Sequence, residues 1–231
     1  DWAIHPKGQA TAVVSRGKLF TFSNWEGPVT QLSEDSPAPA EEEQIAGIRY
    51  RLPQWLPDGK RLIAVTDSPG EETFVIFSQA NGQIGSKLIQ AGDIGRPVRL
   101  AVNPAKEEIV FSNHRYELLW MKLDSGEVRQ IDRGVADHIG GFSWSPDGEW
   151  VAYSVSVSLE SSVIKLWHSE SGEITQLTQP LLDDTVPAFD PQGRFLYFLS
   201  QRTFNPVYDA LHFELSFPRG EKPYLITLRK D

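Results

Sequence analysis

Apolar residues in this chain gather in short runs between turn-forming residues, and the order of these runs repeats five times. The clearest copy begins with the run Gly141–Trp144, turns at Ser145–Glu149 and continues as the apolar run Trp150–Val155. Two further runs, Val163–Trp167 and Ile174–Thr178, complete this repeat. Runs of this length, rich in β-branched and aromatic residues and bounded by turn signals, are typical of β-strands. The repeat therefore predicts an antiparallel meander of four strands.

A proline in the turn after the first run marks each copy. The marker prolines stand at positions 6, 57, 104, 146 and 191, so they are 51, 47, 42 and 45 residues apart. Pro presets φ at the first central position of a type I turn, Asp accepts local backbone hydrogen bonds, and Gly supplies the positive φ that lets a hairpin close. Four-stranded β-propeller blades repeat with a period of roughly 40 to 50 residues. The spacing therefore favours a propeller.

The second strand of each repeat is apolar on both faces. A sheet with one wet face would alternate strictly, so continuous apolar strands indicate sheets that are covered on both sides, as packed blades are. These strands are Ala12–Val14, Leu62–Val65, Ile109–Phe111, Trp150–Tyr153 and Phe195–Leu199. Hairpin signals between later strands occur at Asn81-Gly82, Asp124–Gly126 and Ser169–Gly172.

We therefore expect an all-β chain, a β-propeller of five four-stranded antiparallel blades, in one domain or propeller segment over residues 1–231. The expected blades are approximately residues 1–45, 46–95, 96–138, 139–183 and 184–231. Each repeat begins and ends in phase with the next, from Asp1–Ile4 to Tyr224–Leu228. A ring of such blades would close without a strand shared between its first and last sheets.

Composition narrows the class of partner. The chain has 22 basic and 31 acidic residues, a net charge of −9, and its basic residues are scattered. Phosphate binding needs clustered Lys and Arg, so nucleic acid is not expected as a partner. The absence of cysteine gives no support for disulfides, a thiolate nucleophile or a cysteine-ligated zinc. No apolar stretch approaches about 20 residues and no signal peptide is recognisable, so we expect a soluble, cytoplasmic protein without a membrane anchor.

The last third of the chain carries a family resemblance. The segments Pro187–Ser200 and Arg202–Asp209 resemble the tricorn protease family, specifically its second, seven-bladed propeller. Ser15–Thr21 and Asp67–Glu71 look like earlier blades of the same region. Leu56 and the segment Val102–Ala105 depart from the family's turn pattern, at positions that only shape turns. Five repeats against seven blades, in a chain that begins at Asp1 without methionine, suggest a segment with two blades upstream.

The resemblance implies a role without catalysis in this chain. Family members carry a serine nucleophile and its histidine partner in a separate core beyond the propellers, and nothing here matches that core. We therefore carry over no catalytic residue and expect no cofactor. The implied function is a propeller that guides or gates peptides toward that core, with peptides or a protein partner and the remaining domains of the parent as partners. The alternative is a free-standing propeller of the TolB-like or WD-repeat kind that serves as a binding scaffold.

Other candidate chemistry receives less support from the residues. Asp58, Asp147 and Asp190 recur at equivalent turn positions, which favours a structural role over the unequal carboxylates of a five-bladed glycosidase. The histidines show no metal-ligand spacing, and no Gly-x-Ser-x-Gly elbow is present. The histidines are His5, His114, His138, His168 and His212.

Charged residues gather in the connections that enter the first strand of each blade. These connections border the axial channel in most propellers, so we interpret their charges as possible contacts for peptide termini or a gate. Ordinary solvated or ion-paired loop charges remain the simpler interpretation. The candidates are Arg49, Arg51, Arg96, Arg99, Asp137, His138, Asp183 and Asp184.

Two further features concern surfaces. The acidic, proline-bearing segment Ser33–Gln44 reads as a mobile loop that lengthens the first blade. If the blades do not close into a ring, the apolar faces of the first and last blades are exposed, and we expect them to support self-association.

Overall fold

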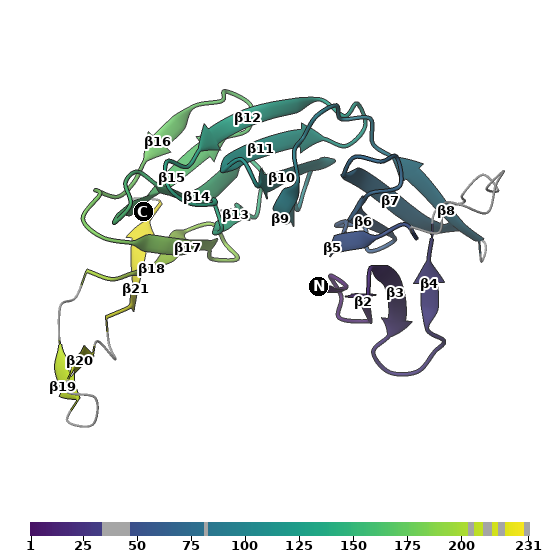
Figure 1. The fold of residues 1–231 in the computed structure, drawn as a ribbon, viewed down its shortest axis with the longest axis horizontal. Coiled ribbons are helices and arrows are strands. Elements are labelled where there is room, and N and C mark those ends of the chain that lie inside the picture. The colour runs from purple at the N-terminus through teal and green to yellow at the C-terminus, as the bar shows by residue number, and fades with distance from the viewer. Residues whose placement is uncertain (34–46, 81–82, 203–205, 210–213, 217–219, 229–231) are drawn as a thin grey trace. The chain divides into compact units, whose positions relative to one another are not determined.

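The computed structural model describes residues 1–33, 47–80, 83–202, 206–209, 214–216 and 220–228. Within these residues every regular element is a β-strand, which confirms the expected all-β class (Figure 1). This part of the chain contains no helix long and apolar enough to cross a membrane. The Asn81-Gly82 turn, the segment Ser33–Gln44 beyond its first residue, and Thr203–Asn205 of the family-like run lie outside the described residues.

Four of the five repeats form complete sheets, each with four consecutive strands in chain order. The first two sheets contain β1 (Trp2–Ile4), β2 (Ala10–Ser15), β3 (Lys18–Ser23) and β4 (Thr30–Leu32), then β5 (Tyr50–Trp55), β6 (Arg61–Thr66), β7 (Thr73–Ala80) and β8 (Gln83–Leu88). The next two contain β9 (Pro97–Val102), β10 (Glu108–Asn113), β11 (Glu117–Lys122) and β12 (Val128–Arg133), then β13 (Phe142–Trp144), β14 (Trp150–Ser156), β15 (Ser162–His168) and β16 (Ile174–Gln176). All five predicted second strands lie in strands, and the four strands predicted for the fourth repeat agree with β13–β16 to within two residues.

The proline turns have the geometry that their composition predicts. The N–H of Gly148 donates to the carbonyl of Ser145 at 2.9 Å, and Gly148 has a φ of 73°. Gly8, Gly59 and Gly193 close their turns in the same way, with φ between 65° and 68°. This left-handed backbone is strained for residues that carry a Cβ, so the recurring glycine is explained by the turn itself.

The fifth repeat differs from the expected four-stranded blade. Its sheet has three strands in the order β17 (Asp184–Phe189), β18 (Phe195–Ser200) and β21 (Lys222–Thr227). The last strand pairs directly with β18 and places Ile226 opposite Leu196, so no further strand lies between them. A separate hairpin, β19 (Val207–Asp209) and β20 (Glu214–Ser216), intervenes in the chain between β18 and β21. An insertion between the second and third strands thus accounts for the length of this repeat.

The chain divides into two compact units. The first comprises residues 1–103, 107–114 and 119–129, and the second comprises residues 104–106, 115–118 and 130–231. In the first unit, Ala12 and Leu19 pack against Tyr50, Leu62 and Phe77, so that one face of the β1–β4 sheet covers one face of the β5–β8 sheet. Burying one large apolar side chain of this kind stabilises the fold by about 1.5–3 kcal/mol.

Two more clusters follow the same arrangement. In the first unit, Ile63 and Phe74 of the β5–β8 sheet pack with Ile109 and Phe111 of β10. In the second unit, Ala152 and Ile164 of the β13–β16 sheet pack with Leu196 and Phe198 of β18. The continuous apolar strand β6 is thus explained, since Leu62 and Ala64 enter one core and Ile63 and Val65 enter the other.

Candidate functional site

The turn aspartates bind backbone N–H groups. Asp58 Oδ1 accepts from the N–H groups of Lys60 at 2.8 Å and Arg61 at 3.1 Å, and Asp147 Oδ1 accepts from the N–H of Glu149 at 3.0 Å. Desolvation raises the pKa of Asp58, but these N–H donors and the Arg61 guanidinium together hold it below its ordinary value. The arrangement therefore supports the structural interpretation of these carboxylates.

Asp190 does not occupy the same position, so the expected equivalence of the three aspartates was wrong. Asp190 precedes its proline, as Ser145 does, and the side chain of each accepts a hydrogen bond from the residue that follows the turn. Asp190 Oδ1 accepts from the N–H of Phe195 at 2.7 Å, and Ser145 Oγ accepts from the N–H of Trp150 at 2.9 Å. Desolvation raises the pKa of Asp190, but N–H donors led by that of Phe195 hold it below its ordinary value of 3.8.

Arg51 and Arg96 converge on one acid, Glu72, which the sequence did not single out. Arg51 Nη2 donates to Glu72 Oε2 at 2.6 Å and to the carbonyl of Pro97 at 2.9 Å. Arg96 Nε lies 3.7 Å from Glu72 Oε1, and its side chain is 67% exposed. Arg51 therefore links β5 to the start of β9, whereas Arg96 keeps most of its guanidinium in solvent.

The other two predicted arginines have different surroundings. The Arg49 N–H donates to Asp67 Oδ1 at 2.7 Å, and Arg49 Nε lies 3.4 Å from Asp67 Oδ2. Arg99 points from β9 into solvent and forms no ion pair within the described residues. The Arg49 and Arg96 side chains are 73% and 67% exposed, whereas that of Arg51 is 29% exposed. Arg96 and Arg99 are the two exposed arginines that lie together at β9.

Asp184 belongs to a buried ion pair. Its carboxylate receives Arg202 Nη2 at 2.5 Å and Arg202 Nε at 3.3 Å, and Asp184 is 1% exposed. Ser162 Oγ accepts a hydrogen bond from the Asp184 N–H at 3.0 Å and donates one to Asp183 Oδ1 at 3.2 Å. Asp183 and Asp184 are therefore brought together with an arginine from the family-like run, and Asp184 is shielded from a ligand.

Asp137 and His138 form a local turn. The His138 N–H donates to Asp137 Oδ1 at 2.6 Å, and the Asp137 N–H donates to Ser156 Oγ at 3.2 Å. The His138 ring packs edge-on against Tyr116, with 4.7 Å between ring centroids. These contacts with Ser156 and Tyr116 lie within the second unit.

The structure reveals a partly buried acid, Asp132, that sequence reasoning missed. Asp132 Oδ2 accepts from Tyr153 Oη at 2.9 Å and from Lys165 Nζ at 2.8 Å. Burial, and then the charge and hydrogen bond of Asp132, raise the pKa of Tyr153 above its ordinary value. Only the register of β14 with β15, which places Tyr153 opposite Lys165, could have signalled this cluster.

Two backbone kinks recur at one position of the repeat. Leu52 in β5 and Val186 in β17 each lie three residues before the aromatic residue that precedes the turn, and each has a φ of 50° at a register shift. Gly141 occupies the matching position in the fourth repeat, where a Cβ would lie 2.9 Å from the Val186 nitrogen. Such bulges redirect the ends of strands near binding sites in many sheets.

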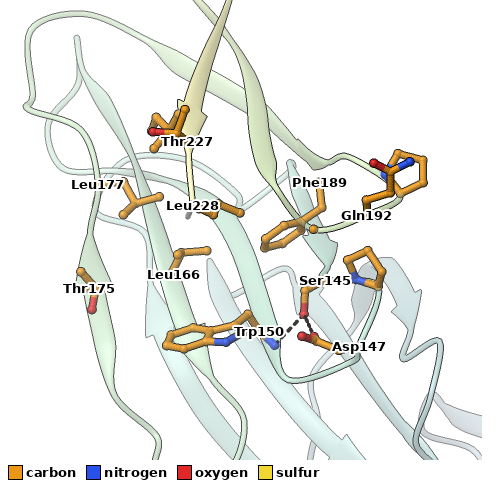
Figure 2. A pocket seen from close by; sticks show the side chains of 14 residues that line it. Ser145, Asp147, Trp150, Leu166, Thr175, Leu177, Phe189, Gln192, Thr227 and Leu228 are labelled. Carbon is orange, nitrogen blue, oxygen red and sulfur yellow. Dashed lines mark hydrogen bonds between the residues drawn. The ribbon is translucent and has the colours of Figure 1, made fainter. Parts of the chain in front are cut away.

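An apolar pocket of about 570 Å³ opens in the second unit between the β13–β16 sheet and the fifth sheet. Figure 2 shows Leu166, Leu177 and Phe189 on its walls, with Trp150 and the Ser145–Asp147 turn at one end. At this end Ser145 Oγ donates to Asp147 Oδ1 at 2.5 Å. The pocket can accept an apolar group, but it offers no catalytic pair of carboxylate and base.

Among the described residues no group of three or more His, Asp or Glu side chains is placed to hold a metal ion. The predicted charges therefore do not converge on one site: Arg51 and Arg96 share Glu72, Asp184 pairs with Arg202, and Arg99 forms no ion pair within the described residues. What the arrangement can do chemically is bind carboxylates through exposed guanidinium groups and receive apolar groups in the pocket.

Comparison with known proteins identifies the family. The model of the tricorn protease second beta propeller domain matches residues 1–231. The chain belongs to this family. A tricorn protease homolog from Saccharolobus solfataricus is 37% identical over 221 residues, which are 96% of this chain and 19% of that protein. Tricorn protease homolog 1 from Streptomyces coelicolor is 32% identical and is covered to 20%.

Solved structures agree on the fold. The crystal structure of the tricorn protease superposes with a TM-score of 0.79 at 21% identity, covering 99% of this chain and 21% of that one. TolB from Acinetobacter baumannii matches with a TM-score of 0.55 at 16% identity, covering 90% of this chain and 52% of that one. The propeller fold is thus confirmed, and this chain spans about a fifth of the length of the tricorn relatives.

Proposed function

We propose that this chain is a non-catalytic propeller portion of a tricorn-like serine protease, and that it guides or gates peptides toward a catalytic core outside these residues. The observation that carries the proposal is the match of the second-propeller family over residues 1–231. The comparisons support a peptidase as the parent. Its serine type and a cytoplasmic location are parts of the proposal, the latter in keeping with the lack of cysteine.

We assign the first peptide contacts to Arg96 and Arg99. Both extend from the β9 region, the first strand of its blade, and such strands border the central channel of propellers. Arg96 has only a 3.7 Å ion pair and Arg99 has none within the described part of the chain. A guanidinium with free donors can bind a peptide carboxylate through two parallel hydrogen bonds. Arg51 and Asp184 serve instead to hold strands.

The test compares peptides with a free and an amidated C-terminus in the full-length parent enzyme. We expect the double substitution R96A/R99A to lower kcat/KM for the free-carboxylate peptide by about tenfold, since about 1.4 kcal/mol of lost binding is tenfold. The amidated peptide should change little. Arg129 is the matched control, because it is an exposed arginine on the outer strand β12, paired with Glu127 at 2.7 Å. Equal loss for both peptides, or an equal effect of R129A, would contradict the assignment.

The second candidate is a free-standing scaffold propeller, and the fold match to TolB favours it. That match covers half of a structure rather than a fifth, but at 16% identity it concerns the fold only. Limited proteolysis of the native protein distinguishes the two. A protease core attached to the propeller supports the first candidate, and a native chain that ends with the propeller supports the second.

A further inference from the structure

His114, the residue after β10, is held by Arg96, the residue before β9. The Arg96 N–H donates to His114 Nδ1 at 2.9 Å, and the His114 N–H donates to the Arg96 carbonyl at 2.9 Å. A ring nitrogen that accepts a hydrogen bond carries no proton, so the proton of this neutral ring is on Nε2. The hydrogen bond from Arg96 therefore fixes both the position and the tautomer of the imidazole.

Gly95 lies directly against the imidazole. Its φ is 65°, and a Cβ at this position would lie 3.1 Å from His114 Cε1 and 3.2 Å from His114 Nδ1. Asn113, which is fully buried, donates from Nδ2 to the carbonyl of Ile94 at 3.0 Å. The end of β10 is thus bound to the connection that leads into β9 at three consecutive residues. His114 is therefore held in place before any ligand arrives, which lowers the entropic cost of binding.

The other ring nitrogen of His114 takes no part in the fold. Within the described residues Nε2 has no hydrogen-bond partner, and His114 is exposed. An asparagine could accept the same bond from the Arg96 N–H, because its Oδ1 takes the place of Nδ1. The fold thus uses one end of the ring, and the other end presents an oriented N–H donor to solvent.

A bulge in β9 brings two arginines to the same side of the chain. The pairing of β9 with β10 leaves out one residue, Val98, at a register shift. Residues three apart in a regular strand point to opposite faces. Here Pro97 and Leu100 are both buried, whereas Arg96 and Arg99 are both exposed. The extra residue therefore places the two arginines together on the exposed side of the third sheet.

We propose that the Nε2–H of His114 is a third donor in the carboxylate site that we assign to Arg96 and Arg99, so this inference rests on the proposed function. The three side chains offer N–H donors and no free acceptor, which selects an anion as the ligand. Glu72 competes weakly for Arg96, because it lies 3.7 Å from Arg96 Nε and is bound to Arg51 at 2.6 Å. A carboxylate has lone pairs for a bidentate guanidinium and for a further N–H.

The carboxylate can come from either of two parts of a peptide. A C-terminal carboxylate and an acidic side chain present the same pair of oxygens to these donors. Three peptides of otherwise equal sequence separate the two sources. The first has a free C-terminus and no acidic residue, the second is its C-terminal amide, and the third is an amide that ends in glutamate.

The test measures kcat/KM for these peptides in the full-length parent enzyme with the substitution His114→Asn. This variant keeps an acceptor for the Arg96 N–H and removes the Nε2 donor. We expect about a tenfold loss for the free-carboxylate peptide, the size of one hydrogen bond to a charged group, and no change for the amide without an acid. A similar loss for the glutamate peptide would show that the site takes a carboxylate from either source.

The substitution His168→Asn is the matched control. His168 Nδ1 also accepts a local N–H, that of Ser171 at 3.2 Å, but His168 lies at the end of β15 in the fourth sheet. H168N should leave the ratio of the kcat/KM values for the free and amidated peptides unchanged. This ratio is insensitive to partial unfolding of a variant, because inactive enzyme lowers both values equally.

The outcomes separate this inference from the proposed function. If R96A/R99A lowers kcat/KM for the free-carboxylate peptide and H114N does not, the assignment of the arginines stands and the role of His114 is refuted. Equal losses for the free and amidated peptides in H114N, or the same change of ratio in H168N, would refute it too. If neither R96A/R99A nor H114N changes the ratio, both proposals are wrong.

Discussion

The buried ion pair of the fifth sheet gives the sharpest stability prediction. Asp184 at the start of β17 is 1% exposed, and Arg202, just after β18, reaches it with both Nη2 and Nε. The same guanidinium lies 5.5 Å from the ring centroid of Phe198 and 5.6 Å from that of Tyr224. The substitution Arg202→Met retains an apolar stem of similar length but removes every donor. It leaves a buried carboxylate with no charge partner among the described residues.

The magnitude follows from the burial of the two partners. Removing one member of a fully buried ion pair costs about 3–5 kcal/mol. The Arg202 side chain is 29% exposed, so water can partly replace it. We therefore expect a loss of about 2–3 kcal/mol in the free energy of unfolding of the second unit. Replacing both partners, as in D184N/R202M, should restore much of this loss, because no carboxylate is then left unpaired.

Urea unfolding followed by tryptophan fluorescence measures the effect, since Trp144, Trp150 and Trp167 lie in the second unit. Arg194→Met is the matched control. The Arg194 guanidinium also lies over an aromatic ring of this sheet, that of Phe195. Its side chain is 57% exposed, however, and its Nε is 3.9 Å from Asp190 Oδ2. Arg194→Met should therefore lower the free energy of unfolding by less than about 0.5 kcal/mol. The reasoning fails if R202M costs no more than R194M, or if the double variant is less stable than R202M.

Two further predictions concern the turns. The fold holds the pKa of Asp190 below 3.8, so the stability that its carboxylate contributes is complete at neutral pH and is lost as the pH falls below 3.8 and through the folded-state pKa. Between pH 5 and pH 2 the urea midpoint of Asp190→Asn should therefore fall less than that of the wild type. Parallel pH profiles of the two proteins would contradict this. Gly8→Ala and Gly59→Ala both meet a left-handed backbone that costs about 1–2 kcal/mol with a Cβ. In Gly59→Ala the new Cβ would also lie 2.5 Å from His5 Nε2, which hydrogen-bonds to the Gly59 carbonyl at 2.8 Å. Thermal unfolding should therefore show that Gly59→Ala loses about 1–3 kcal/mol more stability than Gly8→Ala. Equal losses of stability in the two variants would refute the clash.

Much of the fold was readable from local chemistry. The proline and glycine of each turn specify its backbone, and the apolar run after Gly148 specifies a strand with two covered faces. Each signal lies within a few residues of the chain, so it can be recognised without knowledge of distant contacts. The fifth repeat was misjudged because its insertion moves the third strand, β21, away from β18 in the chain. Strand order in a sheet depends on pairing, which the spacing of runs does not encode.

The candidate residues were less predictable. The sequence placed Arg51, Arg96 and Asp184 in connections that enter first strands, but it named neither Glu72 nor Arg202 as their partners. The equivalence assumed for Asp190 also failed, since a carboxylate before the proline and one after it look alike in a motif. Only the hydrogen bonds to Phe195 and Trp150 show that Asp190 takes the part of Ser145.

The sequence by itself determined the repeat, the all-β class, the turn geometry and the family, because each rests on residues that are close along the chain. The tertiary structure alone decided which charges are shielded. Arg51 and Arg96 both pair with Glu72, yet the side chain of the first is 29% exposed and that of the second is 67% exposed. The difference arises from the groups packed around each side chain, so burial is a property of the packed partners rather than of the residue.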